Sequence, residues 1–441
     1  MKKICRLMSV VLVLTCILIT SAFASSYDST AQELKTMGLF KGTEAGFDLD
    51  RAPTRTEAAV MLVRLLGAEG TAQSQYAAGT IKHPFTDVPV WANPYVAWLY
   101  QNKLVNGASS TLFGADDKCN AQMFCTFVLR ALGYSDAPGG DFTYANSLTY
   151  AEHIGIYSSD LESNTFLRDH AAAISYQALA TELKGTTTTL FSKLVASGAV
   201  SQSTAKPLLD KITTYRAYLQ ACSNMQAINA IDMAMVSAIK MQIPALAQTV
   251  NIDSQFSIKV IVSGNTVQME MITTSVSNGE TSKLNMWVKD GYLYYNDGIT
   301  KVKKALSADE ISKLVSQSSS TAEAPVLTLY QFNSITADKT SDGTLYTIGL
   351  SDNYDFLSLL KDSMDTSSIT ALRVNSCSLQ VLIGNNGVLS SLKESFVMNM
   401  TVTEGGSPVT VTCDVSINGK VNATGNTVTI AYPDFSGYVL Q

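Results

Sequence analysis

Apolar residues follow two different periods along the chain of 441 residues. From residue 27 to about residue 202 they recur with the spacing of one helix face, which predicts a series of helices. From about residue 230 they alternate with polar residues at every second position, which predicts strands. Residues 203–229 read as a helical linker. The expected fold is a multidomain α + β chain, with an all-α domain at 25–202 and an α+β domain at 230–441.

The second half predicts antiparallel strands joined by tight turns. Asp290-Gly291 is a strong hairpin signal before a strand at 292–295. Two short helical inserts are expected at 308–315 and 354–364. Because a sheet with one apolar face must cover that face, we expect a curved sheet, or half-barrel, with helices on its concave side.

The first residues have the composition of an export signal. Three basic residues lie within the first six positions, an apolar run occupies 10–19, and small residues follow. This order predicts a secretory signal peptide at 1–24, cleaved after Ala24. The run is shorter than the roughly 20 residues of a membrane-spanning helix. A lipid anchor at Cys16 is the alternative, but apolar residues continue beyond it. We expect an exported protein without a transmembrane segment in its mature chain.

The net charge of the chain indicates which partners to expect. The net charge of −6 becomes −9 when the three basic residues of the signal are removed. Nucleic acid is therefore not expected as a partner, since binding of phosphates needs clustered Lys and Arg. Apolar residues make up 46% of the chain, which is typical of folded rather than disordered proteins.

The helical half repeats itself at a fixed spacing. Phe47 recurs as Phe113, and Asn120 follows Arg55 at nearly the same separation. A fixed period indicates one supersecondary unit used several times. Each unit reads as a helix, a Gly-containing loop with an aromatic residue, and a second helix. The predicted repeats lie at about 27–68, 83–134 and 141–184.

Several segments of these repeats resemble the S-layer homology (SLH) family. They match its opening motif, the end of its first helix and the start of its second helix. The segments are FTDVPVWA at 85–92, YVAWLYQNKLVNG at 95–107, MGLFKG at 37–42, FDLDRAPTRTE at 47–57, and the more divergent YAEHIGI at 150–156 and FLRDHAA at 166–172. The resemblance extends over most of the helical half and implies a pseudo-threefold helical bundle.

The resemblance also implies a ligand and a set of contact residues. The grooves of such bundles hold acidic, often pyruvylated, secondary cell-wall polysaccharide. Arg55 offers a planar set of donors to a carboxylate, and Trp91 offers a flat apolar face to a sugar ring. Asp87 can accept hydrogen bonds from hydroxyls, and Gly107 allows close approach to the backbone. Arg168 takes the position of the arginine in the third repeat.

Most of these residues also have a structural explanation. Asp87 can cap the helix that follows it, Trp91 can belong to the core, and Glu57 fits a capping box with Thr54. Arg55 is the least easily explained as scaffold. The second repeat has CNAQ at 119–122 where the first has TRTE, so its cation is missing and its groove is expected to be weak. Multivalent display would then help attachment.

The strand half resembles the half-barrels of lipoprotein-localisation factors. Met-rich strands lead into WVKDGYLYY at 287–295. This resemblance implies an apolar ligand, such as an acyl chain, beneath the sheet. The alternative is that the methionines are adaptable core residues.

Two cysteines of this half could be bridged. Cys377 and Cys413 fall on the apolar phase of their predicted strands, and an exported chain meets an oxidising compartment. A disulfide is expected only if the two strands are adjacent; otherwise both are buried thiols.

The sequence patterns of several enzyme classes are missing. HExxH, GxSxG and CxxC do not occur, and Asp48 and Asp50 lack the further ligands of a calcium loop. We expect no catalytic residue, metal or cofactor. The expected function is non-covalent attachment to secondary cell-wall polysaccharide at the cell wall or S-layer surface, with the β domain displayed there. Two alternatives are a carrier or sensor of an apolar ligand, and an envelope hydrolase with converging carboxylates.

Overall fold

The computed structural model describes residues 27–42, 46–158, 161, 165–224, 228–321, 327–350, 369–404 and 407–441. The predicted signal peptide, its cleavage site and the predicted helix at 354–364 lie outside these residues. The chain forms two compact units. Among the described residues, the helical unit runs from 27 to 213 with 328–331, and the sheet unit from 214 to 327 and from 332 to 441.

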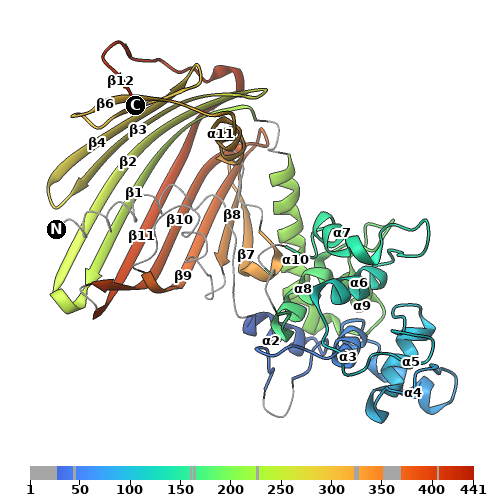
Figure 1. Ribbon diagram of the computed structural model, residues 1–441. Coiled ribbons are helices and arrows are strands. Elements are labelled where there is room, and N and C mark those ends of the chain that lie inside the picture. Colours follow the sequence, from blue (N-terminus) through green and yellow to red (C-terminus); the bar gives the residue numbers. More distant parts are fainter. Residues whose placement is uncertain are drawn as a thin grey trace. The chain divides into compact units, whose positions relative to one another are not determined.

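The helical unit contains the helices expected from the repeats (Figure 1). Their bounds are α2 Asp28–Thr36, α3 Arg55–Leu65, α4 Glu69–Ala77, η1 Val90–Ala92, α5 Asn93–Gln101, α6 Ala121–Ala131, η2 Tyr144–Asn146, α7 Ser147–His153, α8 Arg168–Ala180 and α9 Leu190–Ala196, followed by α10 Gln202–Ser223. Helix α10 occupies much of the predicted linker, and the division between the units falls within it, after Thr213.

The second helix of each repeat forms the core of this unit. Helices α3, α6 and α8 each contact the other two. Most of their residues are buried, including Leu62, Phe124 and Ile174, which have no exposed surface. Burial all around a helix explains why these segments are apolar on more than one face.

The loops of the repeats lie against the helices of other repeats. The backbone N–H of Arg55 at the start of α3 donates to the carbonyl of Asp117, which lies in the loop before α6. The backbone N–H of Arg168 at the start of α8 donates to the carbonyl of Arg51 in the loop before α3. Each contact thus joins the second helix of one repeat to the loop of a neighbouring repeat.

The sheet unit is a large antiparallel sheet that curves without closing (Figure 1). The strand order is β12-β6-β5-β4-β3-β2-β1-β11-β10-β9-β8-β7, and only the β12–β6 pair is parallel. The bounds are β1 Ala230–Ile243, β2 Gln248–Ser263, β3 Thr266–Ser277, β4 Glu280–Lys289, β5 Tyr292–Asn296, β6 Lys301–Ala305, β7 Phe332–Lys339, β8 Gly343–Leu350, β9 Ile369–Gly384, β10 Leu389–Glu404, β11 Ser407–Thr424 and β12 Val439–Leu440. Helix α11, Ala308–Thr321, contacts β2 and β3 and includes the predicted insert at 308–315.

The predicted hairpin between β4 and β5 is present. Asp290 and Gly291 both have positive φ, at 50° and 77°, as a type I′ turn requires. The chain end also packs on this part of the sheet. Phe435 stacks on Tyr294 with ring centroids 3.7 Å apart, and Trp287 and Tyr438 complete the aromatic cluster.

The condition for a disulfide between Cys377 and Cys413, that their strands are adjacent, is not met. Cys377 lies on β9 and Cys413 on β11, and β10 runs between these two strands. Two strand spacings are about 10 Å, beyond the reach of a disulfide. Both cysteines are buried free thiols, and burial raises the pKa of each.

No helix in the described part of the chain is long and apolar enough to cross a membrane.

Candidate functional site

The start of helix α3 presents Arg55 at a fixed position. Thr54 is the N-cap residue, and its side chain accepts a hydrogen bond from the backbone N–H of Glu57 at 3.2 Å. The Glu57 carboxylate accepts in return from the backbone N–H of Thr54 at 2.8 Å. The predicted capping box is confirmed, and it holds Arg55 at the first helical position.

The guanidinium of Arg55 is held without a carboxylate partner among the described residues. Its Nη2 donates to the carbonyl of Asn106 at 2.6 Å, and its Nη1 lies 3.6 Å from the Sδ of Met123. The group lies over the rings of Phe113 and Phe127, at 4.9 Å and 5.7 Å. Its Nε is buried and finds no hydrogen-bond partner in the described structure. Burial lowers the pKa of Arg55 from its ordinary value, but the group stays cationic at neutral pH.

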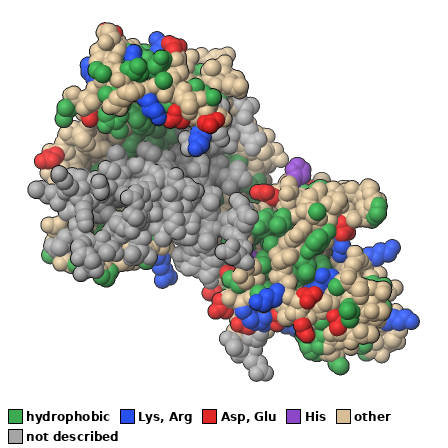
Figure 2. Space-filling view, viewed as in Figure 1, with side chains coloured by type: hydrophobic (Ala, Val, Ile, Leu, Met, Phe, Trp, Pro, Cys, Tyr) green, Lys and Arg blue, Asp and Glu red, His purple; other side chains and the backbone are tan. Residues whose placement is uncertain are grey.

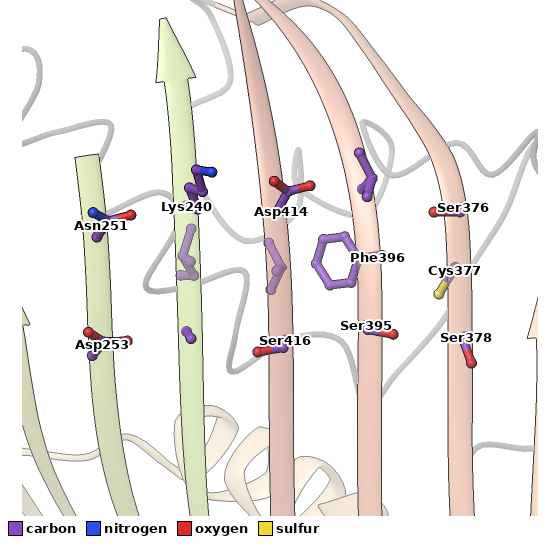
Figure 3. A pocket seen from close by; sticks show the side chains of 14 residues that line it. Lys240, Asn251, Asp253, Ser376, Cys377, Ser378, Ser395, Phe396, Asp414 and Ser416 are labelled. Atoms are coloured by element: carbon purple, nitrogen blue, oxygen red, sulfur yellow. The ribbon is translucent and has the colours of Figure 1, made fainter. Parts of the chain in front are cut away.

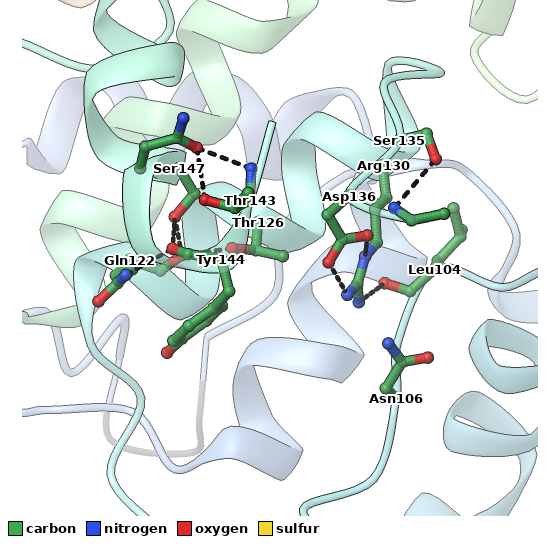
Figure 4. Close-up of polar contacts among 12 residues, drawn as sticks. Leu104, Asn106, Gln122, Thr126, Arg130, Ser135, Asp136, Thr143, Tyr144 and Ser147 are labelled. Carbon is green, nitrogen blue, oxygen red and sulfur yellow. Dashed lines mark hydrogen bonds and ion pairs between the residues drawn. The ribbon is translucent and has the colours of Figure 1, made fainter. Parts of the chain in front are cut away.

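Arg55 lines a cavity of about 260 Å³ between the first two repeats and the start of the third. Figure 4 shows part of its wall, where Arg130 donates to the Asp136 carboxylate at 2.9 Å and 2.5 Å and to the carbonyl of Leu104 at 3.2 Å. Tyr144, which is 46% exposed, closes another side. The cavity thus combines one cation that has no acidic partner among the described residues, one neutralised ion pair and an aromatic ring.

Asp87 does not cap the following helix. Its carboxylate accepts hydrogen bonds from the backbone N–H groups of Phe113, Gly114 and Ala115 at 2.7, 2.7 and 3.0 Å. Burial by itself raises the pKa of Asp87, but these hydrogen bonds outweigh it and hold the pKa below its ordinary value. Asp87 therefore fixes the loop that carries Phe113, on which Arg55 rests.

Trp91 and Gly107 have different environments. Trp91 is 56% exposed and its neighbour Val90 is 87% exposed, so the indole is a surface group rather than core. Gly107 lines the cavity. A Cβ at Gly107 would lie 2.3 Å from the ring of Phe85 and 2.3 Å from the carbonyl oxygen of Ser109. Packing alone therefore requires glycine at this position.

Arg168 occupies the position that is equivalent to Arg55, but it lies in the interior. It is 4% exposed, its Nε donates to the carbonyl of Phe47 at 3.1 Å, and its guanidinium lies 5.6 Å from the ring centre of Phe40. Burial lowers its pKa. In this arrangement its donors do not reach a surface ligand.

The helix caps give the register between the first two repeats. Asn120 is the N-cap of α6 and accepts from the backbone N–H of Met123 at 2.8 Å, as Thr54 does in α3. Asn120 is therefore the equivalent of Thr54, so Ala121, rather than Asn120, stands at the position of Arg55. The second repeat lacks the cation, as expected.

The ion pair of Arg130 and Asp136 was missed from the sequence, although the repeat carries a signal for it. In the register set by the helix caps, Arg64 is the equivalent of Arg130, and its Nε lies 3.2 Å from the Glu69 carboxylate. The same kind of pair thus recurs after the second helix of two repeats.

Comparison with protein families identifies one segment of the helical unit. A model described as the S-layer homology domain matches residues 84–120. These residues are an SLH domain. They contain Asp87, Trp91 and Gly107 and the loop on which Arg55 rests. An SLH domain indicates a protein of the cell surface.

A curated relative and several solved structures are similar to the chain. A "Cell surface protein" of Thermoanaerobacter kivui is 25% identical over 304 residues, and the match spans 63% of this chain but only 38% of the relative. LprF from Mycobacterium bovis has 10% identity and a TM-score of 0.28, over 50% of this chain and 97% of that chain. A lipoprotein-sorting protein domain from Vibrio parahaemolyticus has 8% identity and a TM-score of 0.16, over 51% and 96%.

A larger hollow, of about 620 Å³, lies on the polar face of the sheet (Figure 3). Lys240, Asn251, Asp253 and Asp414 contribute its charged and amide groups, and serines of β9, β10 and β11 contribute hydroxyls. No group of His, Cys, Asp and Glu suited to a metal ion occurs here or elsewhere among the described residues.

Proposed function

We propose that the helical unit attaches this protein non-covalently to an acidic secondary cell-wall polysaccharide, and that the Arg55 cavity binds one acidic sugar. The observation that carries this proposal is the half-buried guanidinium of Arg55, which opens to a cavity and has no carboxylate partner in the described structure. A buried cation without an acidic partner is costly unless a ligand supplies the charge. A pyruvate ketal or a uronic acid offers a carboxylate that fits the planar donors of arginine.

The surface of the unit favours a local site over a general electrostatic attraction. On the face shown in Figure 2, acidic and basic side chains of the helical unit are intermixed rather than gathered by sign. Trp91 adds an exposed ring for a neighbouring sugar. With Ala121 in place of one arginine and Arg168 buried, we infer that one cavity carries most of the affinity. Multivalent display at the surface would then strengthen attachment.

The test is binding of the protein to purified sacculi, before and after chemical removal of the wall polymer. Arg55→Ala should weaken binding at least about tenfold, because hydrogen bonds to a charged group contribute about 1.5–3 kcal/mol. Arg55→Lys keeps the charge but loses the planar donors, and it should be intermediate. Lys82→Ala is the control, since Lys82 is exposed and its loss changes the net charge equally. If the double variant Arg55→Ala, Trp91→Ala bound sacculi as tightly as the unmodified protein, the Arg55 cavity would not be the binding site.

We infer a binding role rather than hydrolysis. Incubation of peptidoglycan and wall polymer with the whole protein should release no sugar. Sustained release of reducing ends above a heat-inactivated sample would contradict this.

We propose a second function for the sheet unit, as a carrier or sensor of an apolar ligand. The observation that favours it is one face of a curved, open sheet that is rich in methionine, with Met233, Met235 and Met241 on β1 and Met398 and Met400 on β10. Methionine adapts to ligands of irregular shape. Native mass spectrometry of the purified protein should show a co-purified lipid; a clean apo mass with no binding of an apolar dye would contradict it.

A further inference from the structure

The apolar face of the sheet carries a group of polar residues that the fold does not explain. Ser237 on β1 lies opposite Ser254 on β2, which lies opposite Ser275 on β3. Thr273 and Ser277 flank Ser275 at the next positions of the same face. We call these residues the hydroxyl patch. Four of them are more than nine-tenths buried, with Ser237 and Ser254 only 1% exposed.

The hydroxyl patch is only partly satisfied by its own hydrogen bonds. The hydroxyls of Ser254 and Ser275 are 2.8 Å apart and bond to each other. Those of Ser237, Thr273 and Ser277 are buried and find no partner among the residues that the structure describes. A buried hydroxyl without a hydrogen bond costs about 1–3 kcal/mol. Three such groups, on the two strands that flank β2, therefore favour a partner that is supplied from outside the sheet.

A buried carboxyl group lies in the same row across the sheet. Ser237 pairs with Ile417 on β11, and Ile417 pairs with Glu394 on β10. Glu394 is 7% exposed, and its carboxyl group contacts the Sγ of Cys377 at 3.9 Å. Burial raises the pKa of Glu394 to about 8, and the hydrogen bond with the Cys377 thiol lowers the pKa by a smaller amount. At neutral pH the group is therefore mostly an uncharged hydrogen-bond donor.

The charges on these strands disfavour an anionic partner. Among their described residues, the apolar positions of β1, β2, β3, β10 and β11 carry no Lys, Arg or His; Lys240, Lys393 and Lys420 lie on the opposite phase. An anionic headgroup would find no cation at these described positions. Donors without acceptors instead suit uncharged oxygen atoms, such as ester carbonyls and free hydroxyls.

We propose that the hydroxyl patch and Glu394 bind the polar end of an uncharged acylglycerol whose chains lie along the methionine-rich face. The proposal rests on the second proposed function. Glu394 donates to an ester carbonyl, and Ser237 and Thr273 bond to the remaining ester and hydroxyl oxygens. Glu394 and Ser237 are two strand spacings apart, about 10 Å, so a ligand with several acceptors fits better than a single carbonyl. Met235 precedes Ser237 on this face of β1 and Met241 lies beyond Ile239, and both methionines can rearrange around the chains.

The experiment uses the whole protein, purified after export and stripped of bound lipid, with three probes in calorimetry. These are dioctanoylglycerol, its diether analogue without carbonyls, and octanoate. The protein should bind dioctanoylglycerol at least about tenfold more tightly than the diether, since each lost hydrogen bond is worth about a factor of ten. It should bind octanoate least. Tighter binding of octanoate would overturn the assignment of an uncharged ligand.

Variants separate a binding role from a structural one. Ser237→Ala and Glu394→Leu should each weaken dioctanoylglycerol about tenfold, while Glu394→Gln, which keeps a donor, should stay within about threefold. Glu394→Leu should also raise the melting temperature of the unliganded protein, which shows that it folds. Ser416→Ala is the control, because Ser416 lies on the polar face of β11. Equal binding by all variants would overturn the inference alone; no binding of any probe by the unmodified protein would overturn the second function with it.

Discussion

Glu394 makes the stability of the sheet unit depend on pH in a way that one substitution should remove. Its carboxyl group is buried on β10, with the thiol of Cys377 as a nearby polar contact. Burial disfavours the ionised form and raises the pKa to about 8 in the folded protein, from an ordinary value of 4.5. Glu394→Gln keeps a polar side chain of the same size but removes the titration.

The sign and size of the effect follow from proton linkage. Between pH 4.5 and about 8 the folded protein keeps the proton while the unfolded chain has released it. Raising the pH through this window therefore favours unfolding, by about 1.4 kcal/mol per pH unit. Over the whole window the loss reaches about 5 kcal/mol. This is an upper limit, because entry of water and relaxation around the charge reduce it. The Gln variant should show no such loss, and its stability relative to the unmodified protein should be greatest at the alkaline end of this window.

The assay needs a signal from the sheet unit alone. The chain has three tryptophans, and only Trp287 belongs to the sheet unit, where it is 5% exposed. Replacing Trp91 and Trp98 with Phe leaves Trp287 as the reporter of urea unfolding. Unfolding free energies are then measured from pH 5 to pH 9 in this background, with Glu394 retained and with Glu394→Gln.

The difference between the two proteins is the informative quantity, since all other titrating groups cancel in it. It should rise steadily from about pH 5 and level off near pH 8 to 9, with the Gln variant more stable at the alkaline end. Parallel curves over this range would show that Glu394 is ionised in the folded protein or reached by water, and the inferred donor role would fail with it.

Three further predictions test the helical unit and the thiols. Asp87→Asn should destabilise the helical unit by about 1–3 kcal/mol in thermal melts, since three backbone N–H groups lose a charged acceptor; an effect no larger than that of exposed Asp116→Asn would contradict this. Gly107→Ala should cost about 1–3 kcal/mol through its clash with Phe85, whereas Gly70→Ala in α4 meets no atom within 4 Å and should be neutral or slightly stabilising. Alkylation under denaturing, non-reducing conditions should modify both Cys377 and Cys413, and protection of the pair would show a disulfide.

Local sequence signals predicted the elements of this protein well. The second helices of the repeats could be found because apolar residues recur with the helical period and capping residues mark their starts, as at Thr54 and Glu57. The β4–β5 hairpin could be found because Asp290-Gly291 suits a turn with positive φ at both residues. These signals act over a few residues, so no knowledge of the rest of the fold was needed.

Pairings between distant segments were not available from such signals. The first strand of the sheet pairs with β11, near the other end of the chain (Ile231 opposite Thr424), and this pairing places β10 between Cys377 and Cys413. Alternation shows that both cysteines share a face, but it contains nothing about strand order. The same alternation does carry a signal for Glu394, because this acid stands between Leu392 and Phe396 on the apolar phase. A single polar residue on an apolar phase does not change the strand assignment, so the pattern alone did not single it out.

The contrast between Arg55 and Arg168 shows why a repeat motif alone does not identify a binding site. Both are first residues of a second helix, and each lies against the loop of another repeat. Arg168 lies 5.6 Å from the ring of Phe40 and is 4% exposed. Arg55 rests on two rings, yet it is only partly buried and lines a cavity. The same residue at the same helix position therefore belongs to the core in one repeat and faces a cavity in another, and the difference arises in the surroundings that other repeats supply rather than in the arginine motif.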